Sequence, residues 1–112
     1  MHDLSFIGWG VVIPESSILA RPHFDVYDIA EEYDMEVDWI AQPHGDNCNK
    51  EGIYIITLKT TRQEIYDQTF INLDEPYVEY GSDAFKVTKF LDQMEIKDPV
   101  TAPGWILAHY RM

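Results

Sequence analysis

The spacing of apolar residues changes along this chain between two periods, and this change limits its fold more than any other feature of the sequence. Ser5 to Ile13 alternates imperfectly, as a strand does, and ends at Pro14. Gly8 and Gly10 within it predict a bulge or the close approach of another backbone, because no phosphate-binding spacing follows them. Between Pro22 and Met35, apolar residues instead recur three and four positions apart, which predicts one face of a helix.

The remaining elements are predicted by the same criteria. Strands are expected at Glu36 to Ile40, Gly52 to Thr60, Glu64 to Leu73 and Trp105 to Tyr110, and a second helix at Ser82 to Glu95. A helix is the competing interpretation of Arg62 to Leu73, but Thr69, Phe70 and Ile71 favour an extended chain. The order β-α-β-β-β-α-β predicts an α+β fold, with a mixed or antiparallel sheet of about five strands and two helices on one face. A ferredoxin-like variant is one topology of this kind.

The strand after the first helix alternates between acidic and apolar residues. Glu36 and Asp38 are expected to point outward, whereas Val37 and Trp39 are expected in the core. The predicted acidic surface of the first helix therefore continues onto this strand.

Length and composition favour one domain, residues 1–112, in the cytoplasm. A chain of 112 residues with 46% hydrophobic residues supports one core, and Cys48 alone allows no internal disulfide. The longest nearly apolar run, Leu4 to Ile13, is about half of the roughly 20 residues that cross a bilayer. No Lys or Arg precedes Arg21, so a secretory signal is not expected.

Negative charge is concentrated in two stretches. Twenty acids against eight bases give a net charge of −12, and residues 22–49 and 63–85 hold eight and six acids with no Lys or Arg. An ordinary solvated face would mix both signs to limit repulsion. We therefore predict a partner-binding surface formed by Asp25, Asp28, Glu31, Glu32, Glu36, Asp38, Glu64, Asp67, Asp74, Glu75, Glu79 and Asp83.

A strongly negative field selects the class of partner. Nucleic acids and anionic membranes would be repelled, whereas a basic protein surface, such as that of a nucleic-acid-binding protein, would be attracted. Interspersed tyrosines would add contact area at little entropic cost. They are Tyr27, Tyr33, Tyr66, Tyr77 and Tyr80. An acidic surface without a specific partner is the simpler alternative.

The loop between the second and third predicted strands holds the weak candidates for a metal site. His44, Asp46 and Cys48 are all zinc-ligand types, but structural zinc sites generally pair two ligand clusters and the sequence contains no second one. Cys48 with His44 also suggests a nucleophile and base, yet nothing identifies a third, orienting group. A plain polar loop is the favoured interpretation, and we expect no metal, no cofactor and no catalytic residue.

At the level of a class, the chain resembles the small acidic proteins that bacteriophages and mobile elements make against host defences, including anti-CRISPR and other DNA-mimic inhibitors. The resemblance rests on the length, the acid-only stretches and a hairpin-like Ile53 to Leu73 before the helix Ser82 to Glu95. Those proteins share no motif or fold, so the resemblance assigns no residue a role. It implies stoichiometric binding to a nucleic-acid-handling protein in the host cytoplasm, either in its basic groove or at an effector step.

Two other classes of function remain open on the sequence alone. A small enzyme with an acidic cleft would bring two or three carboxylates together in a concave pocket. A structural or assembly subunit would instead associate through an exposed edge strand.

Overall fold

A computed structural model describes residues 3–41, 52–65, 83–97, 99 and 102–111. Within these residues one antiparallel sheet contains β1 (Asp3–Pro14), β2 (Met35–Ala41), β3 (Gly52–Leu58), β4 (Gln63–Glu64) and β5 (Gly104–Arg111). The helices are α1 (Glu15–Leu19), α2 (Val26–Glu32), α3 (Asp83–Gln93) and the 3-10 turn η1 (Lys59–Thr61). The predicted α+β class and the predicted order of strands and long helices are confirmed, with α1 as an addition.

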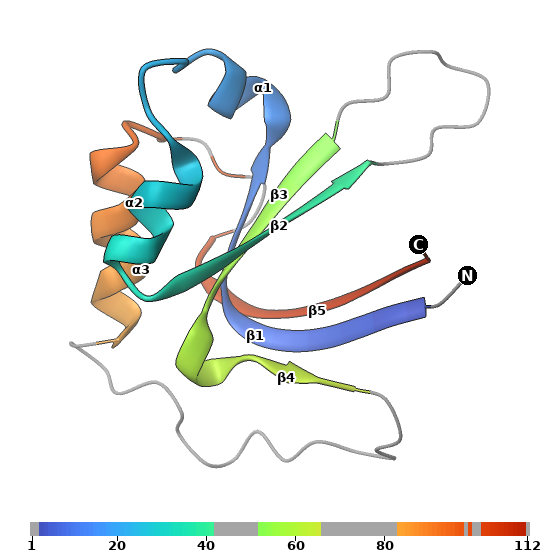
Figure 1. Ribbon diagram of the computed structural model, residues 1–112. Helices are drawn as coiled ribbons and strands as arrows, with labels where there is room; N and C mark the ends of the chain where they lie inside the picture. The colour runs from blue at the N-terminus through green and yellow to red at the C-terminus, as the bar shows by residue number, and fades with distance from the viewer. Residues whose placement is uncertain (1–2, 42–51, 66–82, 98, 100–101, 112) are drawn as a thin grey trace.

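β1 is the central strand of the sheet. One edge of β1 pairs with β5 from Asp3 to Gly10, while the other edge pairs with β4 at Phe6 and Ile7 and with β3 from Gly10 to Pro14. Figure 1 shows that β1 and β5 curve together, away from the direction of β2 and β3. β2 therefore lies at one edge of the sheet, next to β3.

Gly10 lies where three strands converge. It faces Thr57 on β3 and Gly104 on β5, and a Cβ atom at this position would lie 1.9 Å from the carbonyl oxygen of Ile56. The close backbone approach predicted from the glycines is thus present at Gly10. At Gly8, an added Cβ would lie 3.1 Å from side-chain atoms of Thr57.

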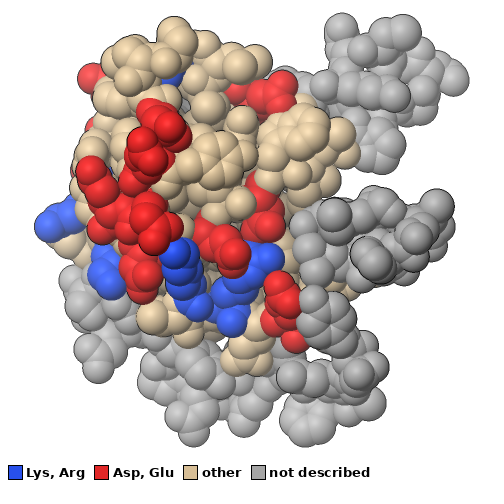
Figure 2. Space-filling model, in the orientation of Figure 1, with Lys and Arg blue, Asp and Glu red and all other residues tan. Residues whose placement is uncertain are grey.

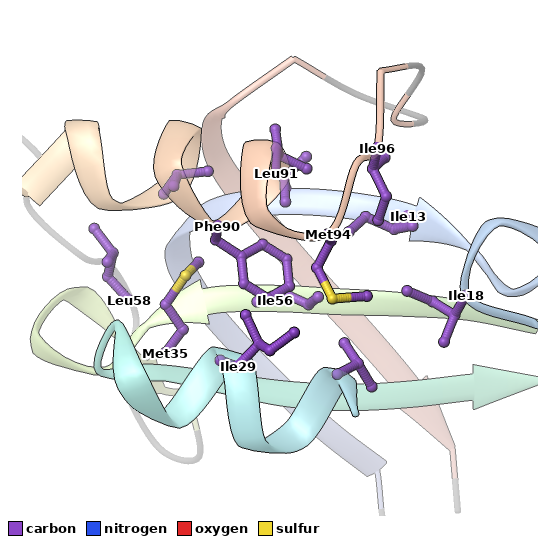
Figure 3. Packing of buried hydrophobic residues seen from close by; sticks show 14 residues of the cluster. Ile13, Ile18, Ile29, Met35, Ile56, Leu58, Phe90, Leu91, Met94 and Ile96 are labelled. Carbon is purple, nitrogen blue, oxygen red and sulfur yellow. The ribbon is translucent and has the colours of Figure 1, made fainter. Parts of the chain in front are cut away.

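α2 and α3 lie side by side against one face of the sheet (Figure 1). The helical spacing of apolar residues turns their buried side chains toward β1 and β3, as Figure 3 shows for Ile29, Phe90 and Met94 around Ile56. The main core cluster consists of Val11, Ile13, Ile18, Val26, Ile29, Ala30, Met35, Ile56, Leu58, Val87, Phe90, Leu91, Met94 and Ile96.

The opposite face of the curved sheet has a smaller apolar cluster. Phe6, Val12, Ile55 and Ala108 are buried there, since successive strand residues point to opposite faces. β1 and β3 are thus apolar on both sides.

Several element boundaries differ from the predictions. α2 begins after Asp25 because the Asp25 carboxylate accepts hydrogen bonds from the backbone N–H groups of Tyr27 and Asp28 and so caps the helix. β4 consists of Gln63 and Glu64, Ile65 follows outside the strand, and residues 66–73 of the predicted strand lie outside the described residues.

Trp39 was predicted in the core, and this prediction is wrong. Met35 is buried where α2 covers the start of β2, and Val37 packs against the main cluster, but Trp39 lies further along the edge strand and is 48% exposed. The alternating pattern identified the strand correctly, but it does not show how far the helix extends over it.

Candidate partner-binding surface

The four predicted acids on and next to α2 are all exposed. Val26, Ile29 and Ala30 turn one side of the helix into the core, so Asp25, Asp28, Glu31 and Glu32 lie on the remaining surface. Figure 2 shows acidic side chains gathered over this part of the molecule. We call these four residues the α2 acids.

Lys59 on η1 pairs with one of the α2 acids. Its ammonium nitrogen lies 3.0 Å from Oε1 and 2.8 Å from Oε2 of Glu31. This hydrogen bond raises the pKa of Lys59 above its ordinary value. The backbone N–H of Lys59 also donates to the carbonyl of Asp34, so η1 is tied to the turn between α2 and β2.

Glu32 is linked to α3 instead. Gln93 donates from Nε2 to Oε2 of Glu32 over 3.3 Å, and it accepts a hydrogen bond from the hydroxyl of Tyr33. These contacts are exposed and hold the outer sides of α2 and α3 together.

Three further predicted acids surround Arg62, whose side chain is 9% exposed. Its Nε lies 2.8 Å from Glu36, Nη1 forms a short ion pair with Asp38, and Nη2 lies 3.8 Å from Glu64. The guanidinium also stacks on the ring of Phe6, 3.8 Å from the ring centre. β2 and β4 thus place carboxylates on both sides of one buried cation.

The predicted surface therefore divides into two groups with different surroundings. The α2 acids face solvent with Lys59 beside them, whereas Glu36, Asp38 and Glu64 bind Arg62 within the molecule. Both cations come from the short segment between the two acid-only stretches, which sheet pairing brings next to β2. Asp67, Asp74, Glu75 and Glu79 lie outside the described residues, as does the side chain of Asp83 at the start of α3.

A second feature of this surface is an aromatic cluster of Glu15, Tyr27, Trp39 and Tyr54. Trp39 and Tyr54 are cross-strand partners on β2 and β3, and the rings of Tyr54 and Tyr27 meet edge to face with centres 6.5 Å apart. The indole N–H of Trp39 donates to Glu15 at the start of α1.

Gly52 provides the space for this indole. An added Cβ there would lie 2.5 Å from the indole nitrogen and 2.8 Å from a carboxylate oxygen of Glu15. Burial raises the pKa of Tyr54 above its ordinary value, and the nearby Tyr27 and Glu15 raise it further.

Sequence reasoning included Tyr27 among the contact tyrosines, but it missed Glu15, Trp39 and Tyr54 as neighbours. They come from α1, β2 and β3, and no local pattern indicates that these elements meet. The alternation of β2 places Trp39 on the same face as Val37, but the pairing of Trp39 with Tyr54 follows from the register of β2 with β3.

The described residues include a hollow of about 420 Å³ between α1 and the end of α3. It is lined by Arg21, Leu91, Asp92, Glu95, Ile96 and Lys97, so charges of both signs meet there. Two of the lining residues, Asp92 and Glu95, are carboxylates, and the cations Arg21 and Lys97 line the same hollow.

Within the described ranges, no group of three His, Cys, Asp or Glu side chains is arranged to hold a metal ion. The weak candidates His44, Asp46 and Cys48 lie outside those ranges. No helix in the described part of the chain combines the length and apolar character needed to span a membrane.

Comparisons with protein-family models, with curated proteins and with solved structures gave no match to this chain.

Proposed function

We propose that this protein is a non-enzymatic binding protein or inhibitor that uses the α2 acids to occupy a basic surface of a nucleic-acid-handling partner. A phage-encoded protein acting against a host defence, of the anti-CRISPR or DNA-mimic kind, is the specific form of this proposal.

The observation that supports it is the exposure of all four α2 acids on one helix. Within the described residues, Asp28 makes no hydrogen bond or ion pair through its carboxylate, and Lys59 pairs with Glu31 alone among the four. Like charges this close repel one another and lower stability. A surface selected for stability alone would place more cations among them.

The physical effect of such a surface is twofold. Its negative field accelerates encounters with a basic partner, and its carboxylates offer oxygen acceptors to Arg and Lys side chains that otherwise bind phosphates. Duplex DNA has about one charge per 1.7 Å of axis, so a competing protein must present dense carboxylates. Consecutive turns of α2 provide them in a rigid arrangement.

The experiment is affinity capture from the native host, followed by titration of the purified captured protein. Asp28→Lys combined with Glu32→Lys leaves the Glu31–Lys59 pair in place and is expected to weaken binding at least tenfold. Asp92→Lys with Glu95→Lys makes the same change in net charge on another surface and is expected to have a much smaller effect. Equal losses in both variants, or affinity independent of salt, would contradict the proposal.

Inhibition requires a second measurement. When the captured partner binds duplex DNA, the protein is expected to displace that DNA at a molar ratio near one, and the Asp28→Lys/Glu32→Lys variant is not. Partner binding without displacement would indicate action at an effector step instead.

A further inference from the structure

The aromatic cluster lies next to the α2 acids and shares Tyr27 with α2. Tyr27 is 55% exposed and Trp39 is 48% exposed, so both side chains are accessible to solvent, while Tyr54 is half-buried against the main core. Exposed aromatic rings with a carboxylate beside them are suited to a specific kind of ligand group.

We propose that the aromatic cluster binds the guanidinium of one arginine side chain of the basic partner. This inference rests on the proposed function, since it names the group that the partner inserts beside the α2 acids. The rings supply stacking faces, and Glu15 supplies the anionic acceptor.

A cation is favoured over a neutral group by the charges that meet at the cluster. The faces of tyrosine and tryptophan rings attract cations within about 6 Å of the ring centre. One oxygen of Glu15 accepts the indole N–H of Trp39, and a carboxylate keeps acceptor capacity after a single hydrogen bond. Asp25 and Asp28, next to Tyr27 on α2, add to the negative potential.

Arginine is favoured over lysine because a planar guanidinium stacks on a ring and donates to carboxylates at the same time. The protein already contains this combination: Arg62 stacks on Phe6 and binds Asp38 and Glu36. The aromatic cluster has the same components on the surface, without a cation among the four residues that form it.

The cluster is also held in place before any ligand arrives. Trp39 is fixed by its hydrogen bond to Glu15 and by its position over Gly52, and Tyr54 packs on the core. Little side-chain entropy is therefore lost on binding.

The test uses N-acetyl-arginine amide as the probe and N-acetyl-citrulline amide as its neutral, nearly isosteric control. Binding is followed by the NMR signal of the Trp39 indole N–H, which Trp39→Phe distinguishes from those of Trp9 and Trp105. The arginine probe is expected to shift this signal in a saturable way, and the citrulline probe is expected to leave it nearly unchanged. An equal response to both probes, or no response to arginine, would overturn the proposal, and both outcomes are measured on the wild-type protein.

Substitutions then locate the site. Tyr27→Leu is expected to weaken arginine binding by about 2- to 5-fold, which is the value of an exposed cation–π contact. Glu15→Gln is expected to weaken it as well. Phe85→Leu is the matched control, because Phe85 is an exposed aromatic residue on α3 with the ammonium of Lys89 already 5.0 Å from its ring centre. Unchanged affinity in Tyr27→Leu, or an equal loss in Phe85→Leu, would contradict the assignment.

The two proposals fail separately. If the α2 acids are needed for partner binding but arginine does not shift the Trp39 signal, the arginine site is wrong and the proposed function is still supported. If arginine binds as expected but the Asp28→Lys/Glu32→Lys variant binds the partner with normal affinity, the proposed function is wrong and the aromatic cluster is still an arginine site.

Discussion

At the scale of single residues, Gly10 has the least space for a side chain among the described glycines. β3 and β5 flank β1 at this point, and the backbone of β3 occupies the space that a side chain would need. Gly104, its partner on β5, has a different environment, since an added Cβ would lie 3.9 Å from the carbonyl oxygen of Ala102, at ordinary van der Waals distance.

Gly10→Ala is therefore expected to lower the free energy of unfolding by about 3 kcal/mol or more, because backbone must move to accept the methyl group. Gly104→Ala, the matched control, is expected to change it by less than about 1 kcal/mol. Urea unfolding followed by tryptophan fluorescence measures both. Similar losses in the two variants would show that β3 does not approach β1 as closely as described.

Tyr54 leads to a prediction about alkaline pH. Burial raises the pKa of the Tyr54 hydroxyl, with smaller contributions from Tyr27 and Glu15. The unfolded chain therefore loses the phenolic proton at a lower pH than the folded protein does. Its contribution to stability is thus fully present below about pH 10, the ordinary tyrosine pKa, and is lost as the pH rises through the folded-state value.

The difference between the ultraviolet pH titrations of the wild type and Tyr54→Phe isolates this group. Tyr54 is expected to titrate at a higher pH than free tyrosine, and Glu15→Gln is expected to shift this titration to lower pH. A Tyr54 titration at the ordinary value, or one indifferent to Glu15→Gln, would argue against the described cluster.

At the scale of elements, Arg62 joins three segments. It binds Glu36 and Asp38 on β2 and Glu64 on β4, and it stacks on Phe6 of β1. Its removal would leave carboxylates facing one another, with Asp38 only 16% exposed.

Arg62→Met keeps most of the apolar volume over Phe6 and removes the charge. We expect it to lower the free energy of unfolding by about 2 kcal/mol, less than for a fully buried pair because Glu36 and Glu64 are partly solvated. Lys59→Met, which removes the exposed partner of Glu31, is expected to cost clearly less. Chemical denaturation of the two variants checks the order, and a larger loss for Lys59→Met would contradict it.

The elements could be predicted from the sequence because period and composition act locally. Val26, Ile29 and Ala30 identify α2 whatever lies beside it, and the run from Ile53 to Leu58 identifies a buried strand. Which acids face solvent and which pair with a cation could not be predicted in the same way. Arg62 lies outside both acid-only stretches, and its contact with Asp38 depends on how β2, β3 and β4 align.

At the scale of the whole molecule, charge is distributed unevenly over the surface. α3 presents Lys89 and Lys86, whereas α2 and the start of β2 present mainly carboxylates, with Lys59 and Arg62 as the nearest described cations. Over the described residues, negative charge is therefore concentrated on α2 and β2 rather than spread evenly. A field of this kind orients the protein as it approaches a basic partner.

Repulsion among these carboxylates should make the stability depend on salt. The ion pairs of Lys59 and Arg62 are attractive and weaken with salt, but among the described residues the acids outside these pairs outnumber them, so screening is expected to stabilise the protein as a whole. Raising NaCl from about 0.02 to about 0.5 M shortens the Debye length from roughly 20 Å to about 4 Å, below the distance between successive turns of charged side chains.

We therefore expect the thermal unfolding midpoint to rise by a few degrees between these two salt concentrations, as measured by circular dichroism. Asp28→Asn with Glu32→Gln removes two of the repelling charges and keeps the Glu31–Lys59 pair, so its midpoint should be higher at low salt and should respond less to NaCl. A midpoint that falls with salt in the wild type would mean that attractive pairs dominate the folded state. The carboxylates of α2 would then contribute to stability, and their exposure would no longer need a partner to account for it.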